Sequence, residues 1–302
     1  MMSASAYQAH RALGELTTYR IGGPAKQLFI PKNIEDLSEI VRCLNETGEE
    51  FFILGGGSNV LISDRVIDKP VILMTGCCKE VKNDGLKISC GASVKLWDLV
   101  NFAIDIGISG LEELTGIPGT LGGALRMNAG AFGNEISSHL ISVSILNEDG
   151  NIENLKFEDI GFAYRSAPGL ESKLIIGAEF RFLKYDREGA KKIADEIWAL
   201  RQSKHPLEYP SAGSVFKKHE QGPAGKFIED AGLKGLRIGN AEISLKHANF
   251  IVNKGGARAI EILALMRKTQ RTVEKKFGIS LELEQKLIGF TEDELKNPEK
   301  YL

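Results

Sequence analysis

Two glycine-rich segments are the residues in this sequence best suited to chemistry. The first is Gly55-Gly56-Gly57-Ser58-Asn59, and the second, residues 116–133, begins Gly-Ile-Pro-Gly-Thr-Leu-Gly-Gly-Ala. Glycine leaves backbone N–H groups uncovered, and several such groups in succession form a concave nest for phosphate. Neither segment has the lysine of a P-loop or the glycine spacing of a Rossmann fingerprint. Together they predict a cofactor that carries a diphosphate, with a pair of structural loops as the alternative.

Four polar residues outside these segments could also do chemistry, although each has an ordinary structural explanation. Arg165 follows the apolar residues 161–163, which predicts partial burial, and a buried guanidinium needs an anion or a carbonyl as partner. Ser214 fits neither Gly-x-Ser-x-Gly nor a catalytic triad. Glu282 and Glu284 share one face of an alternating run, and such a face usually points to solvent. On their own, these positions do not separate chemistry from structure.

The overall composition excludes several classes of protein. The chain has 302 residues, enough for two or three domains, and a formal net charge of −2, so no bulk charge favours nucleic acid or a membrane surface. No apolar run is long enough to span a bilayer, and residues 1–7 lack the pattern of a signal peptide. The four cysteines form no CxxC, which predicts reduced thiols in a cytoplasmic protein. The scattered histidines predict no metal site.

Helix and strand signals alternate in the N-terminal part of the chain. Asn33 caps a predicted helix that Gly48 ends, and a strand at residues 51–54 leads into the first glycine segment. Ser93 is predicted to cap a second helix, which ends at Gly107. Further strands are predicted at residues 71–74, 87–90, 141–146 and 174–182.

A predicted helix at residues 186–203, with Ile193, Ile197 and Leu200 on one face, marks a boundary along the chain. It separates a cofactor-binding region, residues 1–185, from a C-terminal domain, residues 186–302. The C-terminal domain has a short predicted helix at residues 226–231 and a long one at 257–277. The order of elements indicates an α+β fold rather than a series of βαβ units.

Eight motifs appear in a fixed order along the chain. They are Tyr19-Arg20-Ile21-Gly22-Gly23, the two glycine segments, Tyr164-Arg165, Ala212-Gly213-Ser214-x-Phe216-Lys217, Ala224 to Gly235, His247 to Asn253, and Leu281-Glu282-x-Glu284 with Ile288-Gly289. In this order they resemble the UDP-N-acetylenolpyruvoylglucosamine reductases, flavoenzymes of bacterial cell-wall precursor synthesis, over about residues 15–290. A single motif would be weak evidence, whereas the ordered set is specific.

The resemblance implies a fold and an activity. The fold is a vanillyl-alcohol-oxidase or PCMH-type FAD-binding region followed by a C-terminal α+β substrate domain. The activity is NADPH-dependent reduction of UDP-N-acetylglucosamine enolpyruvate to UDP-N-acetylmuramate through FAD. Negative charge that develops on the substrate must be stabilised. The resemblance assigns this task to Arg165 and Glu284, and assigns donation of the proton to Ser214.

The resemblance also implies the binding residues. The UDP-sugar is expected to contact Lys204, Lys218 and His247, where Lys218 replaces the amide side chain that is common in the family. Ser166 directly follows Arg165, another departure from the family pattern. Neither glycine segment contains a residue that commonly links flavin covalently, so we expect non-covalent FAD. The expected cofactor-binding residues are Gly55, Gly56, Gly57, Ser58, Asn59, Pro118, Gly119, Thr120, Gly122 and Gly123.

Two other functions are compatible with part of the sequence. Another FAD-dependent oxidase or dehydrogenase of the same flavin fold would explain the glycine segments but not Ser214 or Glu284. A UDP-sugar-binding regulatory protein without flavin would leave the glycine nests unexplained. For the reductase, we expect NADPH and a UDP-sugar as the only partners of a cytoplasmic monomer, with no nucleic acid, membrane or metal.

Overall fold

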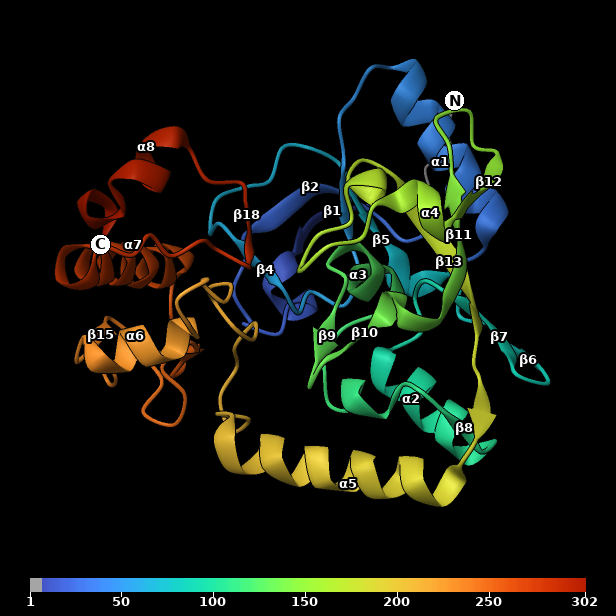
Figure 1. The fold of residues 1–302 in the computed structure, drawn as a ribbon. Coiled ribbons are helices and arrows are strands. Elements are labelled where there is room, and N and C mark those ends of the chain that lie inside the picture. Colours follow the sequence, from blue (N-terminus) through green and yellow to red (C-terminus); the bar gives the residue numbers. More distant parts are fainter. Residues whose placement is uncertain (1–6) are drawn as a thin grey trace. The chain divides into compact units, whose positions relative to one another are not determined.

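The structure is a computed structural model that describes residues 7–302. Residues 1–6, on which the expectation about a signal peptide rests, lie outside the described part. Helices and strands are mixed without a repeating βαβ order (Figure 1), which confirms the α+β class predicted from the sequence.

The described chain forms two compact units. Unit 1 contains residues 7–9, 27–56 and 69–201, and unit 2 contains residues 10–26, 57–68 and 202–302. Unit 2 takes in N-terminal segments because β4 (Val60–Ile62) pairs in parallel with β18 (Lys286–Ile288). The functional division at residue 186 stays a prediction, and the compact units divide the chain at other places.

The smaller sheet of the N-terminal region has the strand order β1-β2-β5-β3. Its strands are β1 (Tyr7–Ala12), β2 (Pro24–Phe29), β3 (Phe52–Leu54) and β5 (Val71–Leu73), and β5 pairs in parallel with both β2 and β3. Helix α1 (Ile34–Glu46) begins after Asn33, whose side chain accepts a hydrogen bond of 2.7 Å from the Asp36 N–H. The cap and strand predicted around this helix are therefore confirmed.

The larger sheet of unit 1 is antiparallel throughout, in the order β12-β11-β13-β7-β6. Its strands are β6 (Val81–Asp84), β7 (Lys87–Gly91), β11 (Leu140–Leu146), β12 (Ile152–Lys156) and β13 (Leu174–Arg181). The main core of unit 1 joins this sheet to helix α2 (Leu96–Asp105), with Leu99 packed in the same buried cluster as Val143 and Phe180. The shorter elements are β8 (Ile108–Ser109), α3 (Leu121–Arg126), β9 (Gly130–Ala131), β10 (Asn134–Glu135), α4 (Phe157–Ile160) and β14 (Lys184–Tyr185).

Two local predictions for this part of the chain are wrong. The Ser93 hydroxyl donates to the Met74 carbonyl instead of capping a helix, and α2 begins two residues later than such a cap would require, after Lys95. In α5 (Arg187–Lys204), Ile197 is buried as expected, but Ile193 is 37% exposed. The inner face of α5 instead carries the small residues Ala190 and Ala194, which let the helix approach the core closely.

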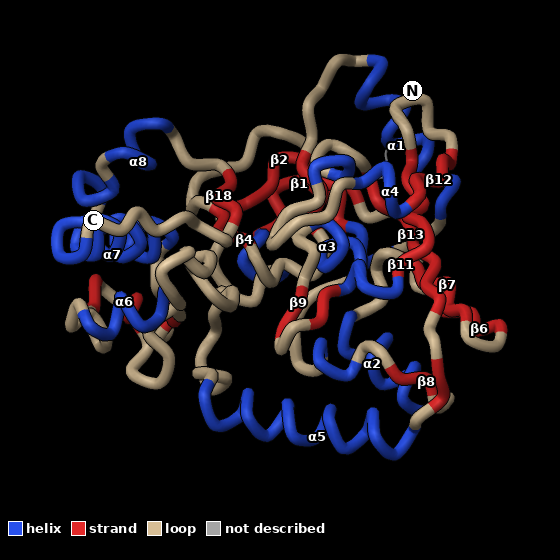
Figure 2. The backbone as a smooth tube through the Cα atoms, viewed as in Figure 1, coloured by secondary structure: helices blue, strands red, loops and turns tan. Residues whose placement is uncertain are grey.

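Unit 2 packs helices against a small antiparallel sheet with the order β15-β16-β17. The strands of this sheet are β15 (Arg237–Ile238), β16 (Ala241–Ile243) and β17 (Ile251–Asn253). The helices of unit 2 are α6 (Ala224–Asp230), α7 (Ala259–Phe277) and α8 (Glu292–Lys296). Helix α7 ends at Gly278, whose φ of +70° confirms the predicted stop signal. The segment 205–223 before α6 contains neither helix nor strand (Figure 2), and it carries Ser214.

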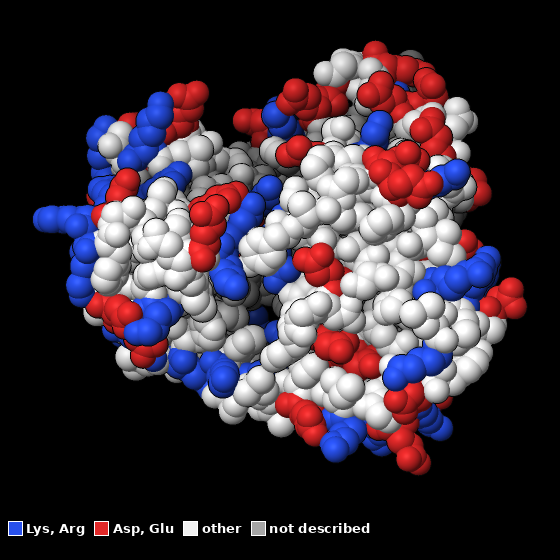
Figure 3. Space-filling view, viewed as in Figure 1, with Lys and Arg blue, Asp and Glu red and all other residues white. Residues whose placement is uncertain are grey.

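Acidic and basic side chains are interspersed on the face seen in Figure 3, in keeping with the small net charge. Within residues 7–302, no helix combines the length and apolar character needed to cross a bilayer. The same residues contain no cluster of three or more His, Cys, Asp or Glu side chains able to hold a metal ion.

Candidate active site

Gly55 and Gly56 of the first glycine segment lie against the second glycine segment in unit 1. A Cβ added to Gly56 would stand 2.9 Å from the Cα of Gly119, and one added to Gly55 would stand 2.8 Å from Thr120 Oγ1. Real Cβ atoms do not approach other atoms so closely, so the contact requires glycine at Gly56, where the opposing atom is backbone. Two segments that are far apart in the sequence thus meet at Gly55, Gly56, Gly119 and Thr120. We call the face that these residues form the glycine surface.

This surface has hydrogen-bond donors to offer. Among the described residues, no backbone N–H of Gly55, Gly56 or Gly57 donates a hydrogen bond to another protein group. The first N–H groups of α3 are different, because Leu121 donates to the Val94 carbonyl and Gly122 to the Ala92 carbonyl, each at 2.8 Å. The first glycine segment therefore offers the open donors of a phosphate nest.

The predicted cofactor residues divide by what surrounds them. A Cβ on Gly122 would be 3.1 Å from the Ala92 Cβ, so this glycine also serves close packing, whereas one on Gly123 would meet nothing nearer than 3.9 Å. In unit 2, the Asn59 side chain donates to the Glu284 carbonyl at 3.2 Å, and a Cβ on Gly57 would stand 2.2 Å from the Leu16 oxygen. Gly57 and Asn59 therefore have structural partners, and Gly123 has a face open to a ligand.

Arg165 lies at the tip of a tight turn in unit 1. Ala163 and Ser166 exchange two backbone hydrogen bonds of 3.0 Å, which places Arg165 in the left-handed region with φ of +52°. Its guanidinium donates to the Gly130 carbonyl at 2.6 Å and to the Asn128 carbonyl at 3.4 Å. The half-buried arginine thus has the carbonyl partners that the sequence led us to expect. Ser166 supplies backbone bonds that hold the turn.

Ser214 and Glu284 come from two segments that unit 2 places side by side. Phe216 and Leu283 form an antiparallel bridge, and the Glu284 N–H donates to the Val215 carbonyl at 2.9 Å. Ser214 and Glu284 are both half-buried. Glu282, which the alternating pattern put on the same face, is exposed and pairs with Lys217 at 2.5 Å. The structure therefore separates the two glutamates and brings Glu284 into the neighbourhood of Ser214.

A buried residue that sequence reasoning missed holds the Ser214 segment. The Gln285 side chain donates to the carbonyls of Ala212 and Gly213 at 3.1 and 3.2 Å, and it accepts a hydrogen bond of 3.1 Å from the Tyr19 hydroxyl. Tyr19 is fully buried, and this burial raises the pKa of its phenol far above the ordinary value. Gln285 thus fixes the backbone next to Ser214. The signal in the sequence that could have identified Gln285 is its amide side chain, which interrupts the alternating pattern of residues 281–284.

Two of the three expected sugar-nucleotide residues lie near each other in unit 2. The His247 ring is 5.5 Å from the His205 ring and 4.8 Å from the Phe250 ring, measured between centroids. Burial lowers the pKa of His247, as do the charges of Lys234 and Lys204, while a backbone hydrogen bond and the charge of Glu229 act in the opposite direction. Lys204 and Lys218 are both exposed. The structure brings Lys204 and His247 together, and a contact of Lys218 with the sugar nucleotide stays a prediction.

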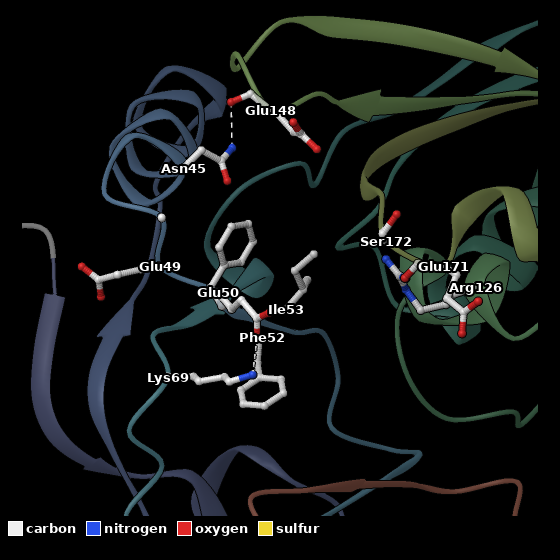
Figure 4. A pocket seen from close by; sticks show the side chains of 12 residues that line it. Asn45, Glu49, Glu50, Phe52, Ile53, Lys69, Arg126, Glu148, Glu171 and Ser172 are labelled. Carbon is white, nitrogen blue, oxygen red and sulfur yellow. Dashed lines mark hydrogen bonds and ion pairs between the residues drawn. The ribbon is translucent and has the colours of Figure 1, made fainter.

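One pocket of unit 1 lies elsewhere. It has a volume of about 670 Å³ and is lined by the N-terminal end of β3, the C-terminal end of α3 at Arg126, and acidic side chains that include Glu148 (Figure 4). The glycine surface lies at the opposite ends of these two elements, after Leu54 and before Leu121. Arg126 donates to the carbonyls of Glu171 and Lys173. This pocket is therefore separate from the glycine surface.

Comparison with known proteins identifies both parts of the chain. Residues 25–156 match the model of an FAD-binding domain, and residues 205–288 match the C-terminal domain of UDP-N-acetylenolpyruvoylglucosamine reductase. A reductase of this name from Listeria innocua is 41% identical over 94% of this chain and 95% of its own length. The chain belongs to the UDP-N-acetylenolpyruvoylglucosamine reductase family. A relative from Carboxydothermus hydrogenoformans is 43% identical over 92% of each chain.

A solved member of the family agrees with the fold. The crystal structure of the UDP-N-acetylenolpyruvylglucosamine reductase from Thermus caldophilus superposes with a TM-score of 0.79, at 33% identity, over 94% of this chain and 100% of that chain. These findings confirm the predicted PCMH-type FAD-binding region with a C-terminal reductase domain, and they confirm an FAD-dependent oxidoreductase. The individual site residues remain predictions.

Proposed function

We propose that this chain catalyses the NADPH-dependent reduction of UDP-N-acetylglucosamine enolpyruvate to UDP-N-acetylmuramate, a step of peptidoglycan precursor synthesis. Family membership over nearly the whole length carries the proposal. The enolpyruvyl double bond receives a hydride at its β-carbon and a proton at its α-carbon, which leaves a lactyl ether. We further propose a cytoplasmic monomer, in which residues 1–185 bind FAD and residues 186–302 bind the substrate.

The glycine surface fits FAD. The open N–H groups of Gly55, Gly56 and Gly57 would hold the diphosphate, and Gly119, Thr120 and Gly123 would line the other side. FAD, when bound, supplies the capacity to accept hydride from NADPH and to give it to the enolpyruvyl group. The absence of His, Cys and Tyr from the glycine segments supports non-covalent binding.

The remaining chemistry belongs to side chains of this protein. The Arg165 guanidinium would bind the substrate carboxylate and stabilise negative charge that spreads from the α-carbon. The Ser214 hydroxyl would donate its proton to the α-carbon, a favourable transfer because an enolate is a strong base. Glu284 would act beside Ser214 on the same charge, and Lys204, Lys218 and His247 would bind the sugar nucleotide. Tyr19 and Gln285 would keep the Ser214 backbone in place.

Product analysis tests the proposal. The purified protein is mixed with NADPH and the enolpyruvyl substrate, and the products are separated and weighed by mass spectrometry. The proposal requires UDP-N-acetylmuramate in an amount equal to the NADPH oxidised. NADPH oxidation that depends on oxygen and leaves the enolpyruvyl compound unchanged would instead indicate an oxidase of the same flavin fold.

A further inference from the structure

Arg201 in helix α5 is a buried cation without a visible partner. The residue is only 9% exposed, and its Nε is shielded from solvent without a hydrogen bond. Within the described residues, its guanidinium takes part in no ion pair or hydrogen bond. Burying a charge without a partner is costly, so proteins rarely retain one without a use. Burial and the nearby charge of Arg165 both lower the pKa of Arg201.

Arg201 is packed against the second glycine segment. A Cβ on Gly116, the first residue of that segment, would stand 2.7 Å from the Arg201 Cδ, so glycine is needed there for the arginine to fit. The guanidinium also lies 6.0 Å from the ring of Phe132, at the tip of the β9–β10 hairpin. Phe132 is itself held in the left-handed region with φ of +53° and is 56% exposed.

Arg165 approaches the same hairpin. Its Nη2 donates to the carbonyl of Gly130 in β9, two residues before Phe132. Two guanidinium groups thus converge on one short hairpin beside the glycine surface, all within unit 1. Their mutual repulsion raises the energy of the site without a ligand and would be relieved by an anion that both can contact. Guanidinium groups suit carboxylate and phosphate oxygens because their N–H donors form a planar fork.

We propose that Arg201 and Arg165 together bind one oxyanion, with Arg201 as the buried half of the pair. The inference rests on the proposed function, in which Arg165 binds the carboxylate of the enolpyruvyl substrate, so this carboxylate is the expected oxyanion; the diphosphate of FAD is the other anion of the reaction, and the test separates the two. In either case Arg201 positions an anionic ligand of the reaction at the β9–β10 hairpin.

Three variants separate these sources from a structural role. Arg201→Met removes the charge at similar length, Arg201→Lys keeps the charge but loses the fork, and Arg126→Met is the matched control. Arg126 also lies in unit 1, and burial lowers its pKa as it does that of Arg201, but its guanidinium already donates to two backbone carbonyls. For each holoenzyme we would measure FAD release on dilution, the substrate dissociation constant from the change in flavin absorbance, and thermal unfolding.

If the oxyanion is the substrate carboxylate, Arg201→Met weakens substrate binding by about 10–100-fold while FAD retention is unchanged. If it is the diphosphate, FAD affinity falls by a similar factor while substrate binding to the loaded protein is unchanged. In both cases Arg201→Lys recovers part of the loss and Arg126→Met changes neither affinity.

Two results overturn the inference. One is that Arg201→Met changes neither affinity. The other is that both affinities fall in step with a lower melting temperature and Arg201→Lys gives no recovery, which would make Arg201 a packing residue. The proposed function fails in a different way, if the wild-type protein does not reduce the enolpyruvyl substrate, and the FAD measurements remain interpretable in that event.

Discussion

At the scale of single residues, the proposed chemistry depends on a serine, and serine is a weak acid in water. Ser214 becomes plausible as a proton donor because the enolate it serves is a strong base and because its backbone is held by neighbours. The Gln285 side chain bonds both carbonyls that precede Ser214, and the adjacent Val215 carbonyl accepts from Glu284. The hydroxyl therefore starts from a fixed position, as proton transfer requires.

Replacing Ser214 by alanine should affect one half of the reaction only. The change removes the proton donor and little volume, so NADPH should still bleach the flavin absorbance at nearly the normal rate. Reoxidation by the enolpyruvyl substrate should slow by about two orders of magnitude or more. Ser214→Cys should recover part of this rate because a thiol can donate. Stopped-flow absorbance measures the rate of each half-reaction. If both half-reactions slowed equally, Ser214 would have a structural role alone.

Gln285 should matter for stability as well as for activity. Gln285→Leu leaves the Tyr19 hydroxyl and two carbonyls without their partner in a buried site, which should cost about 1–3 kcal/mol in the free energy of unfolding. Tyr19→Phe removes only one donor and should cost less. Urea denaturation measures both changes. If the two variants were equally stable, the network around Gln285 would carry little energy.

His247 should make stability depend on pH. Burial lowers its pKa in the folded state below the ordinary 6.5, so the unfolded chain binds the proton more readily. The contribution of His247 is therefore complete above pH 6.5 and is lost as pH falls toward the folded pKa. His247→Gln should show a smaller loss of unfolding free energy than the wild type between about pH 7.5 and 5.5. An identical loss would show that other groups cause the dependence.

At the scale of elements, the glycine surface is where a small change should have the largest effect. Gly56→Val places a side chain where the Gly119 backbone already lies, 2.9 Å from the new Cβ, and it covers the open N–H groups. We expect a folded protein that is purified without its yellow colour. Gly177→Val is the matched control, because its Cβ would be 3.1 Å from the Cys90 oxygen in the larger sheet, at a position that is not among the predicted cofactor-binding residues. It should lose stability but keep FAD.

If Gly56→Val retained FAD as fully as the wild type, the first glycine segment would be a structural turn. Flavin absorbance relative to protein absorbance at equal concentration measures retention in both variants, and circular dichroism shows whether each is folded.

Elements whose signals are local could be predicted from the sequence, and those that depend on distant contacts could not. Helices α1 and α7 are bounded by Asn33 and Gly278, which act within a turn of each helix. Ser93 has the same capping chemistry, yet its hydroxyl is taken by the Met74 carbonyl from another element. The prediction of which face of α5 is buried was wrong, because alanines, which contribute little to a hydrophobic pattern, are buried in place of Ile193.

The candidate site shows the same limit. Glycine composition was enough to find both glycine segments, but not the contact between Gly56 and Gly119, which the fold creates. Likewise, no spacing rule places Glu284 beside the Ser214 segment, since an antiparallel bridge between Phe216 and Leu283 does so. The roles of Arg165, Ser214 and Glu284 came from resemblance, and their local partners came from the structure.

At the scale of the whole molecule, the chain crosses between two compact units several times, so that β4 from the N-terminal region belongs with β18 near the C-terminus. The sequence could not predict these crossings, because hydrophobic patterns report the face of an element and not its partner strand. Gly55 and Gly56 lie in unit 1, and Ser214 and Glu284 lie in unit 2, so each unit carries part of the proposed chemistry.

One measurement tests the central claim most directly. The purified holoenzyme is placed under anaerobic conditions, NADPH is added in an amount equal to the flavin, and the visible spectrum is recorded before and after UDP-N-acetylglucosamine enolpyruvate is added. The account predicts that NADPH bleaches the flavin absorbance and that the enolpyruvyl compound restores it without oxygen. A flavin that stays bleached with the enolpyruvyl compound, and recovers only when air is admitted, would contradict the account.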